Sequence, residues 1–223
     1  MINYEVAPEA LASRIPGGTE LDLRDGRALV TAVGFQFLDT RIRGIAIPFH
    51  RNFDEINLRL YVRRQVGDEV RHGVVFIREL VAPVMVALMA RLAYNEPYEI
   101  APVRRVRAAP GRIEYAWGRG RIGATAASEP VVPREGSEQA FVTQRHWGYT
   151  RQRDGSTVEY HVTHPPWRVS DARDAVFEAE PPGSGPVSAY LVDGSPVEVS
   201  SPSHDLMAAG TVDGQGNRGR RLG

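Results

Sequence analysis

The 223-residue chain contains no cysteine and no lysine, so all 27 of its basic side chains are arginines. The absence of cysteine excludes a disulfide scaffold, a thiolate nucleophile and a metal site with cysteine ligands. The absence of a lysine ε-amine excludes a lysine Schiff base, a covalently attached pyridoxal group and a Walker-type phosphate lysine. Several common classes of enzyme are therefore ruled out before any motif is considered.

The sequence also lacks an excess of charge of either sign and a long apolar run. The 27 acidic residues balance the 27 basic ones, whereas a nucleic-acid groove usually leaves a basic excess, so we expect no nucleic-acid partner. The longest apolar run, residues 80–90, is far shorter than the roughly 20 residues that cross a bilayer. Because no signal-peptide pattern is visible either, we expect a cytoplasmic protein with no membrane partner.

Length and local composition predict the domain organisation. A chain of this size can bury about 70% of its unfolded surface, so it can fold without a disulfide or metal. We expect a single domain over residues 1–200. From residue 201 the chain is rich in Ser, Gly and polar residues, which predicts a disordered C-terminal tail over 201–223.

Short strand-like segments dominate the predicted domain. Asp-Gly pairs at 25–26, 154–155 and 193–194 lie between such segments and predict hairpins, because both turn residues tolerate positive φ. The predicted strands cover residues 20–24, 27–37, 42–48, 53–63, 73–79, 113–118, 121–126, 147–153, 156–163, 187–192 and 197–200. The pattern favours an α+β class that is mainly antiparallel β, as a barrel or a sandwich.

Two helices are predicted among these strands. Residues 84–93 follow Pro83, contain no helix breaker and are apolar nearly all round, which is typical of a buried helix. A short helix is expected over residues 137–143, with Ser137 as its N-cap.

The segment 53–63 alternates clearly between apolar and polar residues. Even positions from Ile56 to Val62 are apolar, while Glu55, Asn57, Arg59 and Tyr61 share the opposite face. From the pattern alone the polar face could meet solvent, which is the more common case, or line the wet interior of a barrel that holds a ligand.

A family resemblance rests on this segment and on four shorter ones. Residues 53–62 read Phe-x-Glu-x-Asn-x-Arg-x-Tyr-Val; further on come Gly-Val-Val-Phe at 73–76, Asn-Glu-Pro-Tyr at 95–98, His-Trp-Gly-Tyr-Thr at 146–150 and His-Pro-Pro-Trp at 164–167. Over roughly residues 2–200 the chain resembles the YqjF-like conserved bacterial family, the domain of unknown function 2071. One departure is Arg145-His146, where the family pattern has an acidic residue and Tyr.

The resemblance implies an acetoacetate decarboxylase-like fold, which is a cone-shaped antiparallel β-barrel with one buried helix and an internal pocket. It also implies that Glu55, Asn57 and Arg59 face that pocket. The Schiff-base lysine of the decarboxylase would fall near the end of the helical segment, where this chain has Tyr-Asn-Glu-Pro at 94–97. Decarboxylation through a lysine therefore cannot be carried over.

The candidate site combines the polar strand face with the residues that close the predicted helix. Glu55 is the candidate catalytic acid or base, and an Arg fork is suited to holding a carboxylate. The candidate ligand-binding residues are Asn57, Arg59, Tyr61, Arg91, Asn95, Glu96 and Tyr98. Because a buried charge needs a partner, we expect Arg59 to contact Glu55, Glu79 or Glu96 in the empty site. No cofactor is predicted.

A second polar cluster is expected on the hairpin around residues 154–155. If Asp154 and Gly155 form a two-residue turn, Tyr149 opposes Tyr160, and Trp147, Tyr149, Tyr160 and Val162 share one face. His146, Glu159 and His161 then share the other face, with Gly148 leaving space between them. Two His and a carboxylate can bind a metal ion, but exposed or singly hydrogen-bonded histidines are the more common case, so no metal site is predicted.

Three functional hypotheses follow. The favoured one is a protein that binds a small anionic or carbonyl-containing molecule in a β-barrel pocket without Schiff-base chemistry. The first alternative is a non-covalent acid/base enzyme, of the lyase or isomerase type, that uses Glu55. The second is a structural or interaction module whose interior is simply packed.

Overall fold

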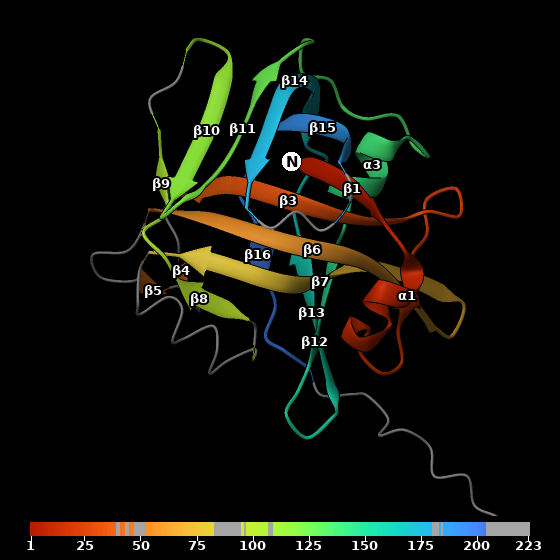
Figure 1. Cartoon of the computed structure of the whole chain (residues 1–223). Coiled ribbons are helices and arrows are strands. Elements are labelled where there is room, and N and C mark those ends of the chain that lie inside the picture. The colour runs from red at the N-terminus through yellow and green to blue at the C-terminus, as the bar shows by residue number, and fades with distance from the viewer. Residues whose placement is uncertain are drawn as a thin grey trace, which may run out of the picture.

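The computed structural model describes residues 1–38, 41–42, 45–46, 52–82, 95, 97–106, 109–179, 183 and 185–203 (Figure 1). The helix predicted over residues 84–93 and the tail from residue 204 onward lie outside these residues. Within them, no helix is long and apolar enough to cross a bilayer.

One large, mainly antiparallel sheet forms the protein, as the sequence predicts. Its hydrogen-bonded order is β16-β13-β12-β7-β6-β3-β1-β15-β14-β11-β10-β9, with β2 on β6 and β8 on β7. The strands are β1 (Ile2–Val6), β2 (Glu20–Leu21), β3 (Ala28–Phe37), β6 (Phe53–Val66), β7 (Glu69–Val81), β8 (Tyr98–Ile100), β9 (Arg104–Arg105), β10 (Arg112–Trp117), β11 (Gly120–Ala126), β12 (Trp147–Arg151), β13 (Thr157–Thr163), β14 (Arg168–Glu178), β15 (Pro186–Asp193) and β16 (Glu198–Val199). Strands β4 (Arg41–Ile42) and β5 (Ile45–Ala46) form a separate pair.

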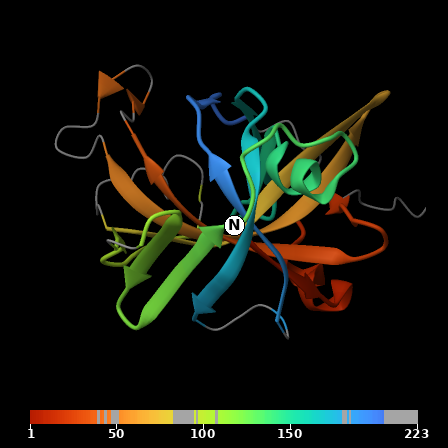
Figure 2. The same ribbon diagram turned by 90° about the horizontal axis from the view of Figure 1, so that it is seen from above.

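The sheet bends strongly but does not close. Of the strand pairs in the described part of the chain, only β7–β12 and β7–β8 are parallel. Strands β10 and β11 cross β3 and β6 at a steep angle (Figure 1), and the view from above shows the same crossing (Figure 2). Among the described strands the hydrogen-bonded path never returns from β9 to β16, so the α+β class holds in the form of an open, curved sheet.

The N-terminal strand lies in the middle of the sheet. Strand β1 pairs with β3 on one side and with β15 on the other, and the α-amino group of Met1 donates to the Tyr190 carbonyl at 2.8 Å. The N-terminus accordingly lies near the centre of the molecule in both ribbon views (Figures 1 and 2). Sequence reasoning missed both β1 and β14.

The two faces of β6 pack into different apolar clusters, as its alternation predicts. On the even face, Ile56 packs with residues of β1, β10 and β11, and Leu60 and Val62 pack with Tyr149 and with Leu11 of α1 (Pro8–Leu11). On the odd face, Tyr61 packs beneath α3 (Glu138–Thr143). Helix α1 continues into a short 3-10 helix, η1 (Ala12–Arg14). The covering of the even face by the predicted helix 84–93 falls outside the described residues.

Helix α3 is the one predicted helix that the structure describes. Ser137 is its N-cap, and the Ser137 hydroxyl accepts a hydrogen bond from the Ala140 amide at 3.2 Å. The capping signature in the sequence therefore located the start of this helix correctly.

The three predicted Asp-Gly hairpins have different outcomes. Asp25 and Gly26 do form a tight turn, with φ of 51° and 78° between bridged Arg24 and Arg27, but β2 then pairs with β6 instead of β3. The predicted hairpin at 193–194 is wrong, because β15 pairs with β14 and β1 while β16 pairs with β13. Backbone pairing also continues past residue 200, since Ser203 bridges to Glu159.

The hairpin at residues 154–155 forms in a different register from the predicted one. The Gln152 amide donates to the Ser156 carbonyl and the Gly155 amide to the Gln152 carbonyl, so residues 153–155 make a three-residue loop. This extra residue shifts the pairing by one position, and Tyr149 opposes Glu159 instead of Tyr160. A shift of one residue moves a strand's side chains to the opposite face, so the predicted grouping is wrong.

Candidate functional site

The polar face of β6 is buried along the first half of the strand. Glu55 is 1% exposed and Asn57 is 3% exposed. The Asn57 side-chain amide donates to Glu55 Oε1 at 3.2 Å, and the Tyr98 hydroxyl donates to Glu55 Oε2 at 3.2 Å. Three of the predicted site residues therefore lie together, and both oxygens of the Glu55 carboxylate face polar hydrogens.

Strand pairing explains how Tyr98 reaches this carboxylate. Strand β8 runs parallel to β7, with Tyr98 beside Glu79, and Glu79 lies opposite Asn57 on β6. Glu79 is 2% exposed, so a second buried carboxyl group joins the cluster. The sequence offers Glu79 as a possible carboxylate partner for Arg59 or Arg91, but not as a member of this cluster. Its place could not be read from the sequence because β7 contains an irregularity opposite Leu58 and Arg59.

Arg59 is partly buried and contacts α3. Its Nη2 donates to the carbonyl oxygen of Val142 at 2.8 Å, while its buried Nε has no hydrogen-bond partner. Among the described residues, Arg59 does not form the expected ion pair with Glu55 or Glu79 and donates to the Val142 carbonyl instead, while Glu96 lies outside them. The reason is the packing of α3, whose last turn offers a free backbone carbonyl to the strand below it. In the described part of the chain, Arg59 thus carries a charge that no carboxylate neutralises.

Tyr61 follows Arg59 on the same face. It is 1% exposed, its hydroxyl lies 2.5 Å from Thr31 Oγ1, and its ring centre lies 5.1 Å from that of Phe141. The guanidinium groups of Arg145 and Arg59 lie 5.1 and 5.9 Å from the centre of the Tyr61 ring. Two guanidinium groups therefore adjoin one phenol ring, and Asp22 already neutralises that of Arg145.

Arg145, which departs from the family pattern, is a buried structural residue. It donates to Asp22 Oδ2 at 2.5 Å and to the Phe141 carbonyl at 2.5 Å, and it lies 3.9 Å from the centre of the Phe141 ring. His72 also contacts Asp22 Oδ2, at 2.7 Å. Sequence reasoning missed this pair because the two partners are 123 positions apart.

The remaining predicted site residues do not join the β6 face. The Asn95 side chain donates to the Arg151 carbonyl at 3.1 Å, near the end of β12. It lines a cavity of about 230 Å³ together with Ser13, Arg14, Val75, Phe76, Ile77, Pro97, Tyr149, Thr150 and Arg151. Neither this cavity nor a smaller one beside Met1 and Tyr115 includes Glu55, Asn57 or Arg59. Arg91 and Glu96 lie outside the described residues.

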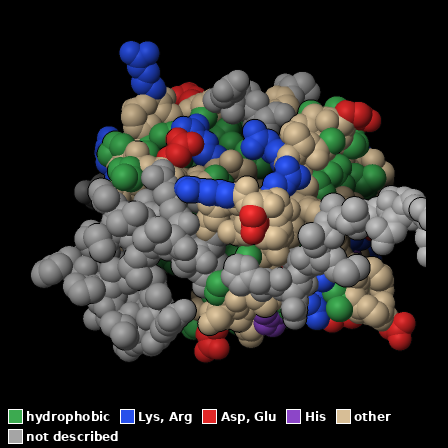
Figure 3. Space-filling view, turned by 90° about the horizontal axis from the view of Figure 1, so that it is seen from below, with side chains coloured by type: hydrophobic (Ala, Val, Ile, Leu, Met, Phe, Trp, Pro, Cys, Tyr) green, Lys and Arg blue, Asp and Glu red, His purple; other side chains and the backbone are tan. Residues whose placement is uncertain are grey.

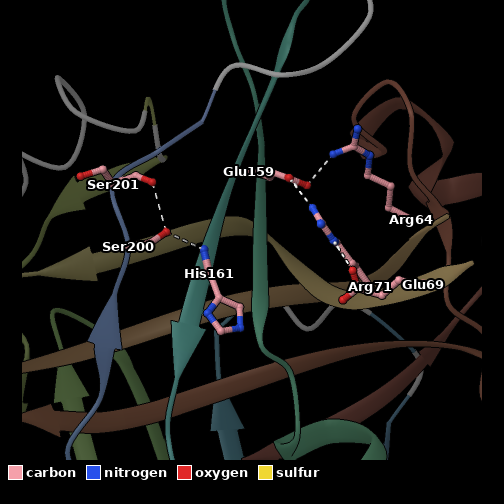
Figure 4. A network of polar contacts seen from close by, with 7 residues as sticks. All are labelled: Arg64, Glu69, Arg71, Glu159, His161, Ser200 and Ser201. Atoms are coloured by element: carbon pink, nitrogen blue, oxygen red, sulfur yellow. Dashed lines mark hydrogen bonds and ion pairs between the residues drawn. The ribbon is translucent and has the colours of Figure 1, made fainter. Parts of the chain in front are cut away.

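The predicted histidine cluster is arranged differently from the expectation. Gly148 leaves no space, because a Cβ there would lie 2.1 Å from Cζ of Tyr160. Glu159 is held by Arg64 at 2.5 Å and Arg71 at 2.7 Å, and the His161 amide donates to Ser200 (Figure 4). His146 stacks on His164 instead, at 4.7 Å. No metal-binding group of three His, Asp or Glu side chains occurs among the residues that the structure describes.

Surface charge is mixed. Viewed from below, arginine and acidic side chains are interspersed over the described surface (Figure 3). This distribution agrees with the zero formal net charge of the sequence.

Comparison with known proteins agrees with this fold. A family model described as an uncharacterized conserved protein, DUF2071, matches residues 1–202. The chain belongs to the DUF2071 family. No curated protein matches it.

Solved structures of the acetoacetate decarboxylase type resemble this DUF2071 protein. An acetoacetate decarboxylase from Legionella pneumophila has a TM-score of 0.61 and 12% identity, covering 93% of this chain and 83% of that one. The enduracididine biosynthesis enzyme MppR complexed with pyruvate has a TM-score of 0.55 and 14% identity, covering 90% and 87%. An acetoacetate decarboxylase-like enzyme from Sphingomonas wittichii has a TM-score of 0.52 and 16% identity, covering 86% and 82%. At these identities the likeness shows the fold.

Proposed function

We propose that this DUF2071 protein binds a small molecule with a carboxylate or carbonyl group at the odd-numbered face of β6, without Schiff-base chemistry. The observation that carries the proposal is the unneutralised charge of Arg59. Its guanidinium is partly buried, keeps a buried Nε–H without a partner and has no carboxylate neighbour in the described part of the chain. An unneutralised cation of this kind is unfavourable unless a ligand completes its coordination.

The neighbours of Arg59 fit the same ligand chemistry. Asn57 Oδ1 is also buried without a partner, so this side chain keeps an unused acceptor two residues from the Arg59 fork. A planar guanidinium recognises a carboxylate through paired hydrogen bonds. The pyruvate complex of MppR, a protein of similar fold, supports a small oxo acid as the first ligand to test.

Glu55 gives this site a second possible role, the acid/base enzyme. The observation in its favour is the Tyr98 hydroxyl at 3.2 Å from Glu55 Oε2, which provides a direct path for a proton between a carboxyl group and a phenol. Under this hypothesis, Glu55→Gln abolishes exchange of the α-protons of the bound ligand with solvent and leaves its affinity within about threefold, whereas loss of Arg59 weakens binding itself.

The test is calorimetric titration of pyruvate into the wild-type chain and two arginine variants. Arg59→Gln should weaken binding about tenfold or more, because it removes the charge and the fork. Arg63→Gln is the matched control: Arg63 lies further along β6, is exposed, and contacts Glu20 at 2.8 Å. It should bind like the wild type. Equal affinity of Arg59→Gln and wild type, or no binding to a wild-type chain that is folded by circular dichroism, would refute the proposal and favour a packed interior.

A further inference from the structure

Two strands share one edge of β7 and leave a gap between them. Strand β6 pairs with β7 along its whole length, so β8 and β12 both pair with its other edge. Strand β12 pairs only at Gly73 and Val74, and the pairing with β8 begins at Glu79. In the described part of the chain, this edge of β7 therefore has no strand partner over residues 75–78.

The cavity of about 230 Å³ lies at this gap. Residues 75–77 of β7 line it together with the end of β12, the segment just before β8, and Ser13 and Arg14 of η1. The pairing of β7 with β6 is also irregular at this point, as bulged strands often are beside binding sites. Ser13, Arg14 and Arg151 are exposed, so the cavity opens to solvent and a ligand can enter it.

One side of the cavity is apolar. Val75 and Ile77 belong to the same cluster as Leu60, which is on the even-numbered face of β6. Arg59 is on the odd-numbered face, so the cavity and the Arg59 site are separate places on the sheet. Burial of a ligand's hydrocarbon part against Val75 and Ile77 would be favourable.

The rim of the cavity is positive. Arg14 and Arg151 line it, and the lining contains no Asp or Glu, although acidic and basic residues are equally numerous in the chain. Arg151 is held in place, since its Nη2 donates to the Ile15 carbonyl at 2.5 Å and its own carbonyl accepts from the Asn95 side chain at 3.1 Å. Among the described residues, neither guanidinium is paired with a carboxylate. An anion at this rim is therefore attracted by two unneutralised charges.

We propose that this cavity binds a small monocarboxylate with a compact hydrocarbon body. The carboxylate lies at Arg14 and Arg151, and the hydrocarbon packs on Val75 and Ile77. The volume of about 230 Å³ equals that of about eight water molecules in the liquid, which suits a ligand of this size and is too small for a nucleotide. The proposal does not depend on the ligand site at Arg59.

Hexanoate is the probe, titrated into the isotope-labelled wild-type chain while the backbone amide resonances are recorded. Saturable shifts should be confined to residues 13–14, 75–77 and 149–151. Hexanamide has the same size and no charge, so it should bind about fivefold more weakly or worse. Inorganic phosphate has no hydrocarbon body and should not displace hexanoate.

Three variants separate the contributions. Arg14→Gln should weaken hexanoate binding about fivefold and leave the fold intact, because the Arg14 side chain is exposed and makes no hydrogen bond among the described residues. Arg153→Gln is the matched control, since Arg153 is an exposed arginine outside the cavity lining, and it should bind like the wild type. Ile77→Ala should weaken the binding of hexanoate more than that of acetate, because it removes apolar contact area.

The outcomes distinguish this site from the one at Arg59. Shifts that are confined to residues around Arg59 and Val142 would refute the cavity site and support the odd-numbered face instead. Equal affinity for hexanoate and hexanamide, or equal affinity of Arg14→Gln and the wild type, would also refute the proposal. The absence of saturable shifts in the folded wild-type chain would refute the cavity site alone, because pyruvate binding at Arg59 is measured separately.

Discussion

Replacing Asp22 by Asn should remove a large part of the protein's stability. The Asp22 carboxylate is the charged partner of Arg145, and the side chains of the two residues are only 7% and 5% exposed. Burial lowers the pKa of Arg145, and the contact with Asp22 opposes that effect, so the carboxylate helps to keep the buried guanidinium charged. In Asp22→Asn this positive charge stays buried without its neutralising partner.

The magnitude follows from the local contacts. Removing one member of a buried ion pair costs about 3–5 kcal/mol. Arg145 keeps its bond to the Phe141 carbonyl and its contacts with two aromatic rings, which places the expected loss near the lower end, at about 3 kcal/mol. For a chain of this length that loss lowers Tm by roughly 6–12 °C.

Urea unfolding followed by far-ultraviolet circular dichroism measures this loss. Glu20→Gln is the control, because Glu20 contacts Arg63 on the surface and its loss should leave the free energy of unfolding unchanged within error. In the double variant Asp22→Leu/Arg145→Met the buried charge is absent, so it should be more stable than Asp22→Asn. A loss below about 1 kcal/mol for Asp22→Asn at an unchanged m-value would refute the reasoning. So would a double variant whose loss of stability equals the sum of the losses of Asp22→Leu and Arg145→Met measured separately.

Three further results are expected. Gly148→Ala should lower the free energy of unfolding by roughly 1–3 kcal/mol in a thermal or urea melt, because the new Cβ overlaps the Tyr160 ring; Gly194→Ala, where the structure leaves open space, should not. Burial lowers the pKa of His164 below its ordinary value of 6.5, so the unfolded chain takes up a proton more readily than the folded chain as pH falls through 6.5. The free energy of unfolding should therefore decrease below about pH 6.5 and stay constant above it. The His164→Gln variant should lose less stability than the wild type between about pH 7 and pH 5. Ser137→Ala should cost about 1 kcal/mol in the same assay, since it removes the cap of α3; an unchanged midpoint would show that the cap contributes nothing.

Local patterns in the sequence were enough to predict several elements correctly. The alternation of residues 53–63 identified β6 and its two faces, because side chains of a strand point to opposite sides at every step. Ser137 marked the start of α3, because a capping hydroxyl acts within a few residues. The same locality brought Glu55 and Asn57 together without any knowledge of the rest of the fold.

Features that depend on distant residues could not be predicted in this way. The Asp-Gly pair at 154–155 is typical of a two-residue turn, but the actual loop has three residues. Because loop length sets the pairing register, Glu159 lies opposite Tyr149. Strand β14 was missed because its sequence does not alternate regularly; its backbone is irregular at Asp174, with φ of 52°. The contact of Arg59 with Val142 depends on the docking of α3, which no local pattern describes.

The central place of β1 has a consequence for biosynthesis. Its hydrogen bonds on one side go to β15, more than 180 positions later in the chain, so the middle of the sheet cannot be completed until β15 has been synthesised. Until β15 emerges from the ribosome, β1 presents an unpaired edge that can associate with another nascent chain. Such a long-range pairing also makes folding slow, because a large loop must close before the contact forms. A chain that is truncated before β15 should therefore aggregate, even though most of the strands around the Arg59 face are already present in it.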